Sequence, residues 1–338
     1  MKLHSLFTIQ CVLSMKRLMM AILLFLKYAT FKKIINSLEV EAERKMGKII
    51  VEGKPYFIKI QVTNMCDAGC RYCLKERPED SLGKMSLADF KAIIDKVKNY
   101  AYMVALHYSG EPLLNEAIYE MAEYAHLNKI ATYMSTNLQN FRREDNQKML
   151  TCGLDLLTVA IDGTSERTYK YHRKKGTLAK VLDNISILVE TKKKNKSKYP
   201  IINLQFIVTS YNEHEALTVK ALAKKLRVDS FDLKPVGTTD KKLLPKNHRY
   251  LRSVYKKNNF KRKPCWWLWS ARVVLWDCKI IPCCMLPFNK NNLANHDFFS
   301  IGNLPLYQKL RRYSYVPDRD SGCGECLIPY GSVFSQTI

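Results

Sequence analysis

The residues with the clearest chemical potential are three cysteines within one short segment. Cys66, Cys70 and Cys73 form a CxxxCxxC pattern, which offers three thiolates from a single loop and omits a fourth ligand. A structural zinc ion or an electron-transfer cluster is normally closed by four protein ligands. A 4Fe-4S cluster on three thiolates instead keeps one iron open to a small molecule. The pattern predicts such a cluster, and a zinc loop completed by a distant Cys or His is the alternative.

The segments around this loop predict an α/β fold. A strand is expected over residues 56–63, so the cysteine loop leaves its carboxyl end, where barrel-like α/β folds carry their chemistry. Further strands are expected at 101–108, 130–135, 156–161, 202–209 and 231–236. Helical patterns lie between them near 86–99, 118–126, 178–193 and 213–227. This alternation predicts a parallel sheet with right-handed crossovers.

Polar motifs follow the second, third and fourth of these strands. They are Ser109-Gly110-Glu111-Pro112, Ser135-Thr136-Asn137 and Ile161-Asp162-Gly163, the last followed by Arg173. Their order after CxxxCxxC resembles the radical SAM enzymes, and the resemblance covers most of the chain. It implies a partial (β/α)6 TIM-like barrel. It also implies that the open iron binds S-adenosylmethionine.

The resemblance assigns roles to individual side chains. The cofactor-binding residues that it implies are Tyr72, Gly110, Glu111, Ser135, Asn137, Asp162 and Arg173. In the family, the residue at Tyr72 packs near the adenine, the one at Glu111 receives the ammonium group, and the one at Arg173 pairs with the methionine carboxylate. Ser135 and Asn137 would reach the ribose or sulfonium side.

A second group of cysteines follows a change of pattern near residue 240. The predicted ligands of this group are Cys265, Cys283, Cys323 and Cys326. With Ile301-Gly302-Asn303-Leu304 between them, they resemble the Twitch domain, a shortened SPASM domain that carries an auxiliary 4Fe-4S cluster. The first two would flank a β-hairpin that turns near Lys279. A zinc ribbon is the alternative, and Cys278 and Cys284 either compete as ligands or pack as apolar side chains.

These patterns divide the chain into three predicted parts. They are an N-terminal amphipathic helical region at 1–50, a radical SAM core at 51–240 and a Twitch/SPASM-like domain with a hairpin and helix at 241–338. In the first part, the apolar run at 18–26 is too short to span a bilayer and has basic flanks. It either lies in a membrane interface or packs on the barrel as a helix.

The chain is strongly basic, with 55 Lys and Arg against 31 Asp and Glu and a net charge of +24. This excess favours an anionic partner: a membrane surface, or a small-molecule, glycan or peptide substrate that carries negative charge. No recognised nucleic-acid module accompanies it, so no specific nucleic-acid binding is predicted. The 11 cysteines fall in metal-binding spacings, which favours a reducing cytoplasm, with peripheral contact at the inner membrane face as an option.

The resemblance implies that a flavodoxin- or ferredoxin-type donor reduces the first cluster and that a 5′-deoxyadenosyl radical abstracts hydrogen from the substrate. The predicted function is an oxidoreductase that removes two electrons from a sugar, cyclitol or glycan-linked hydroxyl. Radical modification of a peptide or protein side chain is the first alternative. A non-catalytic iron-sulfur or zinc protein that binds anionic surfaces is the second. Lys234, Arg173, Glu213 and Tyr108 are open candidates for a general base.

Overall fold

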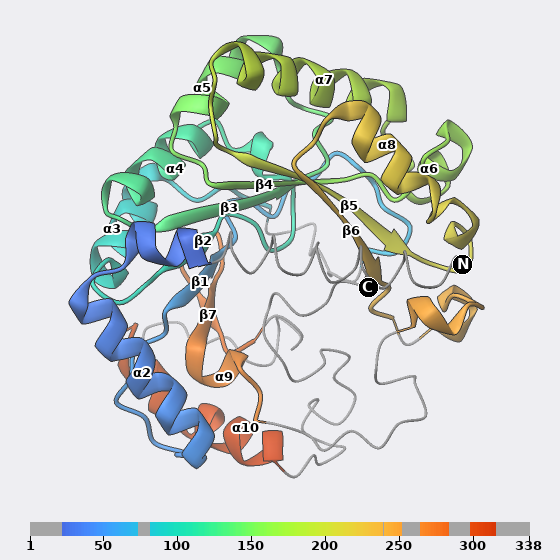
Figure 1. The fold of residues 1–338 in the computed structure, drawn as a ribbon. Helices are drawn as coiled ribbons and strands as arrows, with labels where there is room; N and C mark the ends of the chain where they lie inside the picture. The colour runs from blue at the N-terminus through green and yellow to red at the C-terminus, as the bar shows by residue number, and fades with distance from the viewer. Residues whose placement is uncertain (1–21, 74–81, 239, 252–263, 284–297, 316–338) are drawn as a thin grey trace, which may run out of the picture.

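The computed structural model describes residues 22–73, 82–238, 240–251, 264–283 and 298–315 (Figure 1). Its centre is one eight-stranded sheet with the order β6-β5-β4-β3-β2-β1-β7-β8. The strands are β1 (Phe57–Ile60), β2 (Met103–Ala105), β3 (Ala131–Thr136), β4 (Leu156–Ala160), β5 (Ile201–Val208), β6 (Ser230–Pro235), β7 (Ala271–Val274) and β8 (Ile280–Ile281). Strands β1 to β7 pair in parallel and β8 is antiparallel to β7.

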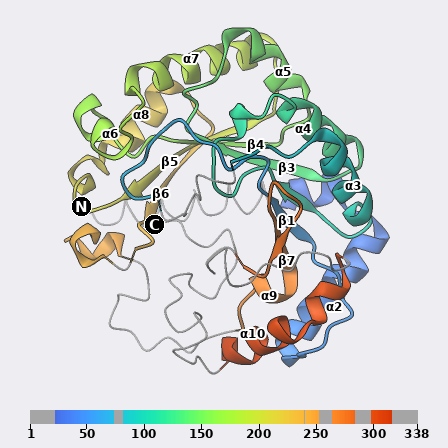
Figure 2. The same ribbon diagram turned by 180° about the vertical axis from the view of Figure 1, so that it is seen from behind.

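All six strands expected from the sequence form, in chain order across the sheet, which confirms the α/β class with its mostly parallel sheet. The outer side of the sheet is covered by helices, as Figures 1 and 2 show. These helices are α3 (Leu87–Val97), α4 (Ile118–Leu127), α5 (Asn146–Thr151), α6 (Glu166–His172), α7 (Leu178–Lys194) and α8 (Thr218–Leu226). The Ser86 hydroxyl accepts a hydrogen bond from the backbone N–H of Asp89 at 3.0 Å and caps α3, as expected. The short helices α5 and α6 were not predicted.

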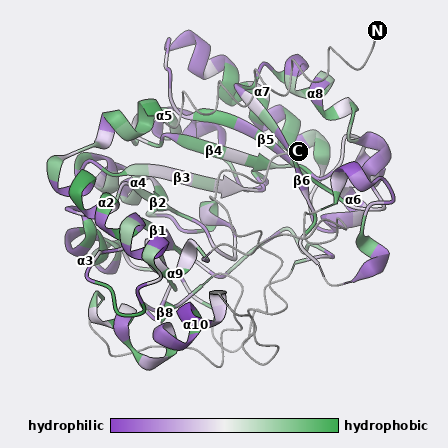
Figure 3. Cartoon of the chain, turned by 60° about the horizontal axis from the view of Figure 1, so that its bottom comes forward, coloured by the Kyte–Doolittle hydropathy of each residue, from purple (hydrophilic) through white to green (hydrophobic). Residues whose placement is uncertain are grey.

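The burial of the strands separates the two faces of the sheet. Along β5, buried residues alternate with half-buried ones. The buried set, including Leu204 and Phe206, packs in the core with residues of α7 and α8 such as Leu188 and Val219. Successive side chains of a strand point to opposite faces, so the half-buried set lies on the side away from these helices. We call that side the concave face. Figure 3 shows a largely hydrophobic β4 and a hydrophilic α6.

The C-terminal part extends the same sheet. β7 pairs in parallel with β1, and a hairpin with its turn before Lys279 leads to β8, which confirms the expected hairpin. Cys278 lies in this turn with a φ of 64°, a left-handed conformation that favours glycine. The helices α2 (Phe31–Met46), α9 (Trp267–Ser270) and α10 (Pro305–Tyr315) gather beside β7 (Figures 1 and 2). The predicted boundary near residue 240 remains a prediction.

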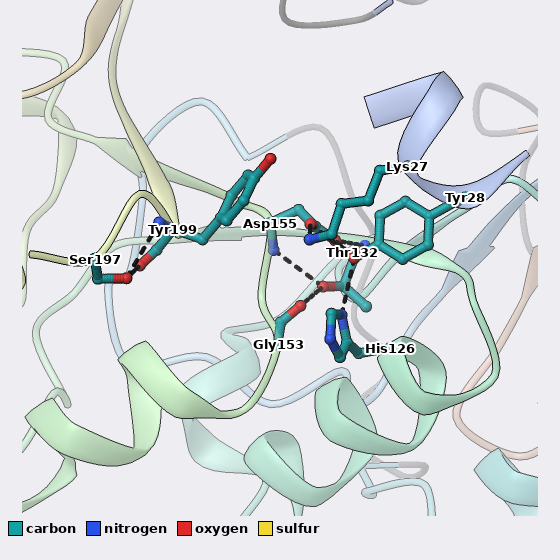
Figure 4. A network of polar contacts seen from close by, with 8 residues as sticks. All are labelled: Lys27, Tyr28, His126, Thr132, Gly153, Asp155, Ser197 and Tyr199. Atoms are coloured by element: carbon teal, nitrogen blue, oxygen red, sulfur yellow. Dashed lines mark hydrogen bonds and ion pairs between the residues drawn. The ribbon is translucent and has the colours of Figure 1, made fainter. Parts of the chain in front are cut away.

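Residues 22–28 form a helix that packs on the core of the sheet through Leu24 and Tyr28. Buried Asp155 holds this helix in place, as Figure 4 shows. Its carboxylate accepts hydrogen bonds from the Tyr28 hydroxyl and the Lys27 ammonium group, each at 2.8 Å, and from the Thr132 backbone N–H at 2.9 Å. Burial and the Asp155 charge raise the pKa of Tyr28, so its hydroxyl remains a donor. Within the described ranges no helix is long and apolar enough to cross a membrane.

Candidate active site

The CxxxCxxC loop is held against the segment that follows α6. The backbone N–H of Arg71 donates to the carbonyl of His172 at 2.8 Å, and that of Lys175 donates to the carbonyl of Ala68 at 3.2 Å. Cys70 and Arg173 form an isolated antiparallel bridge between these two hydrogen bonds. The carboxyl end of β1 therefore positions the cysteines beside the residues that follow β4.

The three thiols lie close enough to affect one another. Burial raises the pKa of Cys70 to about 11, and the charges of Cys66 and Cys73 add to the rise while Arg173 opposes it. Cys66 and Cys70 are half-buried and Cys73 is exposed. Within the described ranges, no three His, Cys, Asp or Glu side chains converge on one point as the ligands of a single metal ion would. The thiolates of a four-iron cluster bind different irons, so they need no such point.

Arg173 presents a buried and unsatisfied donor next to Cys70. One of its terminal amino groups donates to Asp162 at 2.6 Å, and both side chains are almost completely buried. Burial disfavours the charged guanidinium, but Asp162 and Cys70 keep the pKa of Arg173 above its ordinary value. Its Nε is buried without a hydrogen-bond partner among the described residues. A carboxylate is the natural partner for such a group, which fits the methionine carboxylate of the expected cofactor.

Asp162 is held by several backbone contacts. Its φ is 47°, and its second carboxylate oxygen accepts from the backbone N–H of Ile207 at 2.8 Å. Its carbonyl accepts from the side-chain amide of Asn212 at 3.1 Å. Asp162, which follows β4, is thereby bound to β5, and its carboxylate holds the Arg173 guanidinium in place. The sequence placed Asp162 in the cofactor site, and the structure shows it contacting Arg173.

Glu111 connects the ends of β2 and β3. One carboxylate oxygen accepts from the Thr136 hydroxyl at 2.5 Å and from the backbone N–H of Leu113 at 3.2 Å, and the other accepts from the backbone N–H of Asn137 at 2.7 Å. The side chain is 2% exposed. Burial raises its pKa to about 7, although these three donors oppose the rise. Glu111 therefore fixes the loop after β2 to the end of β3 through these three hydrogen bonds.

Two further predicted residues lie in the same region. The side-chain amide of Asn137 donates to Asp67, inside the cysteine loop, at 2.7 Å. Gly110 has a φ of 89°, and a Cβ there would lie 2.3 Å from the Thr63 carbonyl oxygen. This position requires glycine because two backbone segments meet there. Ser135 is half-buried on β3, where it pairs with Thr158 of β4, and its backbone N–H donates to the His107 ring at 3.2 Å.

Aromatic rings form one wall near the cysteine loop. Tyr72 stacks on His172 with ring centroids 5.1 Å apart, and Tyr171 stacks on Tyr211 at 3.4 Å. These four residues and Asp162 line a cavity of about 80 Å³. The expected adenine contact of Tyr72 stays a prediction. Sequence reasoning did not assign Tyr171, His172 and Tyr211 to the site. Tyr171 and His172 end α6 and Tyr211 follows β5, and their only signal is their aromatic character.

The predicted second cluster is described only in part, because Cys323, Cys326 and Cys284 lie outside the described residues. Cys265 and Cys283 flank the β7–β8 hairpin as expected, and both pack against the same apolar clusters, built around Trp267 and Trp269. Cys278 is exposed on the turn. The structure thus brings together two of the four predicted ligands.

Buried cationic side chains gather beside Cys283. Arg272 lies 4.4 Å from the ring centroid of Tyr307 and Arg311 lies 5.8 Å from it. Burial raises the pKa of Tyr307, the two arginines oppose the rise, and the Cys283 charge adds to it. In the described part of the chain, neither arginine has a carboxylate within ion-pair distance. The Tyr307 hydroxyl and Arg272 Nε are buried without a described hydrogen-bond partner. Such donors fit an anionic group at this position, as an all-thiolate iron-sulfur cluster is.

Comparison with known proteins identifies the class. Residues 60–216 match the Radical SAM superfamily, the span from β1 to the loop after β5 that contains the cysteine loop, Glu111 and Arg173. This chain therefore contains a radical SAM domain within residues 60–216. It is 23% identical to the GTP 3′,8-cyclase of Syntrophomonas wolfei, over 54% of this chain and 56% of that protein. It is 25% identical to the AdoMet-dependent heme synthase of Methanosarcina barkeri, over 57% and 54%.

Solved structures share the fold. SuiB of Streptococcus suis bound to S-adenosylmethionine has a TM-score of 0.64 and 15% identity, covering 82% of this chain and 72% of that chain. The structure of anSMEcpe with bound AdoMet has a TM-score of 0.57 and 15% identity, covering 78% and 84%. The chain spans about half the length of the curated relatives that it matches.

Proposed function

We propose that this protein cleaves S-adenosylmethionine reductively and uses the product radical to abstract hydrogen from a substrate on the concave face. When bound, a reduced 4Fe-4S cluster and S-adenosylmethionine supply a 5′-deoxyadenosyl radical. The observation that carries the proposal is the buried, unpartnered Arg173 Nε beside the Cys70 thiol. A non-catalytic cluster protein has no use for a carboxylate-binding group at that position.

The protein's own groups supply binding and orientation. Cys66, Cys70 and Cys73 would hold three irons, and Arg173, fixed by Asp162, would orient the methionine carboxylate. Tyr72 and its stacked neighbour His172 offer a flat surface to the adenine. A flavodoxin- or ferredoxin-type protein is the proposed electron donor.

The first test is reductive cleavage of the cofactor. Anaerobically reconstituted protein with dithionite and S-adenosylmethionine should release 5′-deoxyadenosine, and Cys70→Ala should abolish the release because one iron loses its ligand. Cys152→Ala, in the core away from the loop, is the matched control for loss of a thiol and should retain release. Absence of 5′-deoxyadenosine from iron-replete wild-type protein would overturn the proposal in favour of a binding protein.

We further propose a second 4Fe-4S cluster on Cys265, Cys283, Cys323 and Cys326 and a net two-electron oxidation of a hydroxyl-bearing sugar, cyclitol or glycan. The bound cofactor would accept one hydrogen atom from the carbon that bears the hydroxyl. The four cysteines would hold a cluster able to accept the second electron, and the hydroxyl proton would pass to a base. Support comes from the Arg272 Nε and the Tyr307 hydroxyl near Cys283, which are buried without a hydrogen-bond partner among the described residues.

Iron content tests the second cluster. The double variant Cys265→Ala/Cys283→Ala should fall from about eight to about four irons per chain and lose one electron paramagnetic resonance signal, because two of its four ligands are gone. Release of 5′-deoxyadenosine should persist, since the first cluster is separate. Unchanged iron, or stoichiometric zinc in the wild-type protein, would contradict the assignment.

Modification of a peptide side chain is the second candidate. The specific observation is the shared fold with SuiB bound to the precursor peptide SuiA, at a TM-score of 0.64 and 14% identity. For either candidate, isotopic hydrogen from the substrate should appear in 5′-deoxyadenosine. The candidates differ in which substrate is consumed: mass spectrometry should show a changed side chain on an intact peptide in one case and an oxidised sugar or cyclitol in the other.

A further inference from the structure

Three exposed basic side chains lie around the cysteine loop. Arg71 is part of the CxxxCxxC loop itself, and Lys174 and Lys175 lie on the segment after α6 that holds this loop. We call these three residues the basic rim. None of their side chains belongs to the set that we assign to the cofactor or to a cluster.

Direct contacts place the basic rim against the loop. The Arg71 Nε donates to the carbonyl of Tyr171 at 3.0 Å, and its guanidinium carbon lies 4.4 Å from the ring centroid of that tyrosine. The backbone N–H of Lys175 donates to the carbonyl of Ala68 at 3.2 Å. The Lys175 side chain crosses Gly69, since a Cβ on that glycine would lie 3.1 Å from the Lys175 Cγ. The charges of the rim therefore lie beside one short loop.

The positive charge of the basic rim is not cancelled nearby. Within the described ranges, no carboxylate lies within ion-pair distance of its three side chains. Residues 66–73 contain one carboxylate, Asp67, which accepts from the side-chain amide of Asn137 at 2.7 Å. Asp162, on the other side of the loop contact, pairs with Arg173. The rim therefore presents an excess of positive charge to solvent.

Cys73 brings the first cluster site close to the same surface. Its side chain is exposed, whereas Cys66 and Cys70 are half-buried. An electron that enters from outside the protein therefore crosses the least protein at Cys73. Arg71 stands two residues before this thiol, so a partner that approaches Cys73 also meets the basic rim.

We propose that the basic rim docks the electron donor of the first cluster, a small acidic electron-transfer protein, over Cys73. Carboxylates of the partner would pair with Arg71, Lys174 and Lys175. Transient electron-transfer complexes have small interfaces, in which opposite charges act mainly by raising the association rate. The donor loses one electron, the cluster gains it, and no atom is transferred. This inference rests on the proposed function, because it names the surface through which the same site receives its electron.

The test measures, by stopped flow, how fast reduced protein donors reduce the reconstituted holoenzyme. The probes are a flavodoxin and a ferredoxin, both acidic. Lys174→Glu/Lys175→Glu should slow reduction by the preferred probe at least about tenfold at low salt, because the reversed charges repel the partner. Lys174→Gln/Lys175→Gln should show a smaller decrease, and added salt should slow the wild type.

Lys193→Glu/Lys194→Glu is the matched control for the change in net charge. These exposed lysines lie at the end of α7 that leads into the amino end of β5, whereas the cysteine loop follows the carboxyl end of β1. The two sites are thus at opposite edges of the parallel sheet, and the control should keep the wild-type rate. Equal slowing by the control, unchanged rates in both rim variants, or no reduction of the wild type by either probe would overturn the docking surface.

Dithionite separates this inference from the proposed function, since this small reductant needs no docking surface. With dithionite, the rim variants should reach the same final extent of cluster reduction as the wild type and release 5′-deoxyadenosine, which also shows that they fold and hold their cluster. Loss of that release would mean that the lysines act on the cofactor, and would overturn the docking role. Lack of 5′-deoxyadenosine from the wild type would instead overturn the proposed function.

Discussion

At the scale of single residues, Glu111 combines two properties that usually exclude each other. It is nearly completely buried, yet it accepts hydrogen bonds from Thr136, Leu113 and Asn137. Burial favours the protonated acid and the three donors favour the carboxylate, and burial prevails, with a pKa of about 7. The residue that joins the ends of β2 and β3 therefore titrates near neutral pH in the protein without ligands.

This property predicts a pH-dependent contribution to stability. The folded protein holds the Glu111 proton up to about pH 7, whereas the unfolded chain loses it near 4.5. Ionisation therefore favours the unfolded state as the pH rises between these values, by a total on the order of 3 kcal/mol, and the effect is constant above them. The stability advantage of wild type over Glu111→Gln should shrink across this window.

Anaerobic melting temperatures at a series of pH values measure this difference. Exposed Glu120→Gln on α4 is the control for loss of a carboxylate. If the difference between wild type and Glu111→Gln does not vary between pH 4.5 and 7, the folded carboxylate is ionised throughout and the burial argument is wrong.

At the scale of elements, the N-terminal helices have two different faces. Asn36, Val40 and Glu43 of α2 are buried against the fold, and Asp155 holds the preceding helix through Tyr28. The opposite side of α2 exposes a row of apolar side chains, which we call the α2 stripe. Its members and their exposed fractions are Phe31 79%, Ile35 49%, Leu38 63% and Met46 67%.

The α2 stripe predicts binding to an anionic membrane surface. Apolar side chains at helical spacing, flanked by exposed Lys32 and Lys45 in a strongly basic chain, match an interfacial helix. The holoenzyme should cosediment with phosphatidylcholine vesicles that contain phosphatidylglycerol, and added salt should weaken binding. Ile35→Ser/Leu38→Ser should weaken it at least about fivefold, because two apolar side chains no longer enter the interface.

Leu217→Ser is the matched control for this prediction. Leu217 is 72% exposed and precedes α8, away from the α2 stripe, so its loss should leave vesicle binding unchanged. Equal binding to vesicles without anionic lipid would contradict the preference for an anionic surface. Unchanged binding by Ile35→Ser/Leu38→Ser would show that the α2 stripe does not bind the vesicles.

At the scale of the whole molecule, local patterns predicted the elements well. The six strands, the Ser86 cap and the hairpin near Lys279 form as expected, because alternation, capping and turn residues act within a few positions. The pairing of β7 with β1 was not foreseen, since a strand pattern does not name its partner across more than two hundred residues. Helices α5 and α6 were missed because they are only 6 and 7 residues long, too short to show a distinct helical periodicity.

The candidate site shows the same division. CxxxCxxC and the motifs after β2 to β4 named most of its residues, because parallel strands bring their carboxyl ends to one edge. The sequence did not show that Asp162 holds Arg173, or that Asn137 reaches Asp67 in the cysteine loop. Those contacts depend on where side chains point at the carboxyl edge of the folded sheet, and the spacing of residues along the chain does not give that direction.

The sequence by itself determined the kind of chemistry, because three thiols in one loop and polar strand ends limit the ligands that a site can hold. Only the tertiary structure brought Arg272 and Tyr307 beside Cys283, and Asn137 beside Asp67 of the cysteine loop. These groups come from strands and helices far apart in the chain. Their proximity follows from the curvature and order of the sheet, which arise when all the strands pack at once.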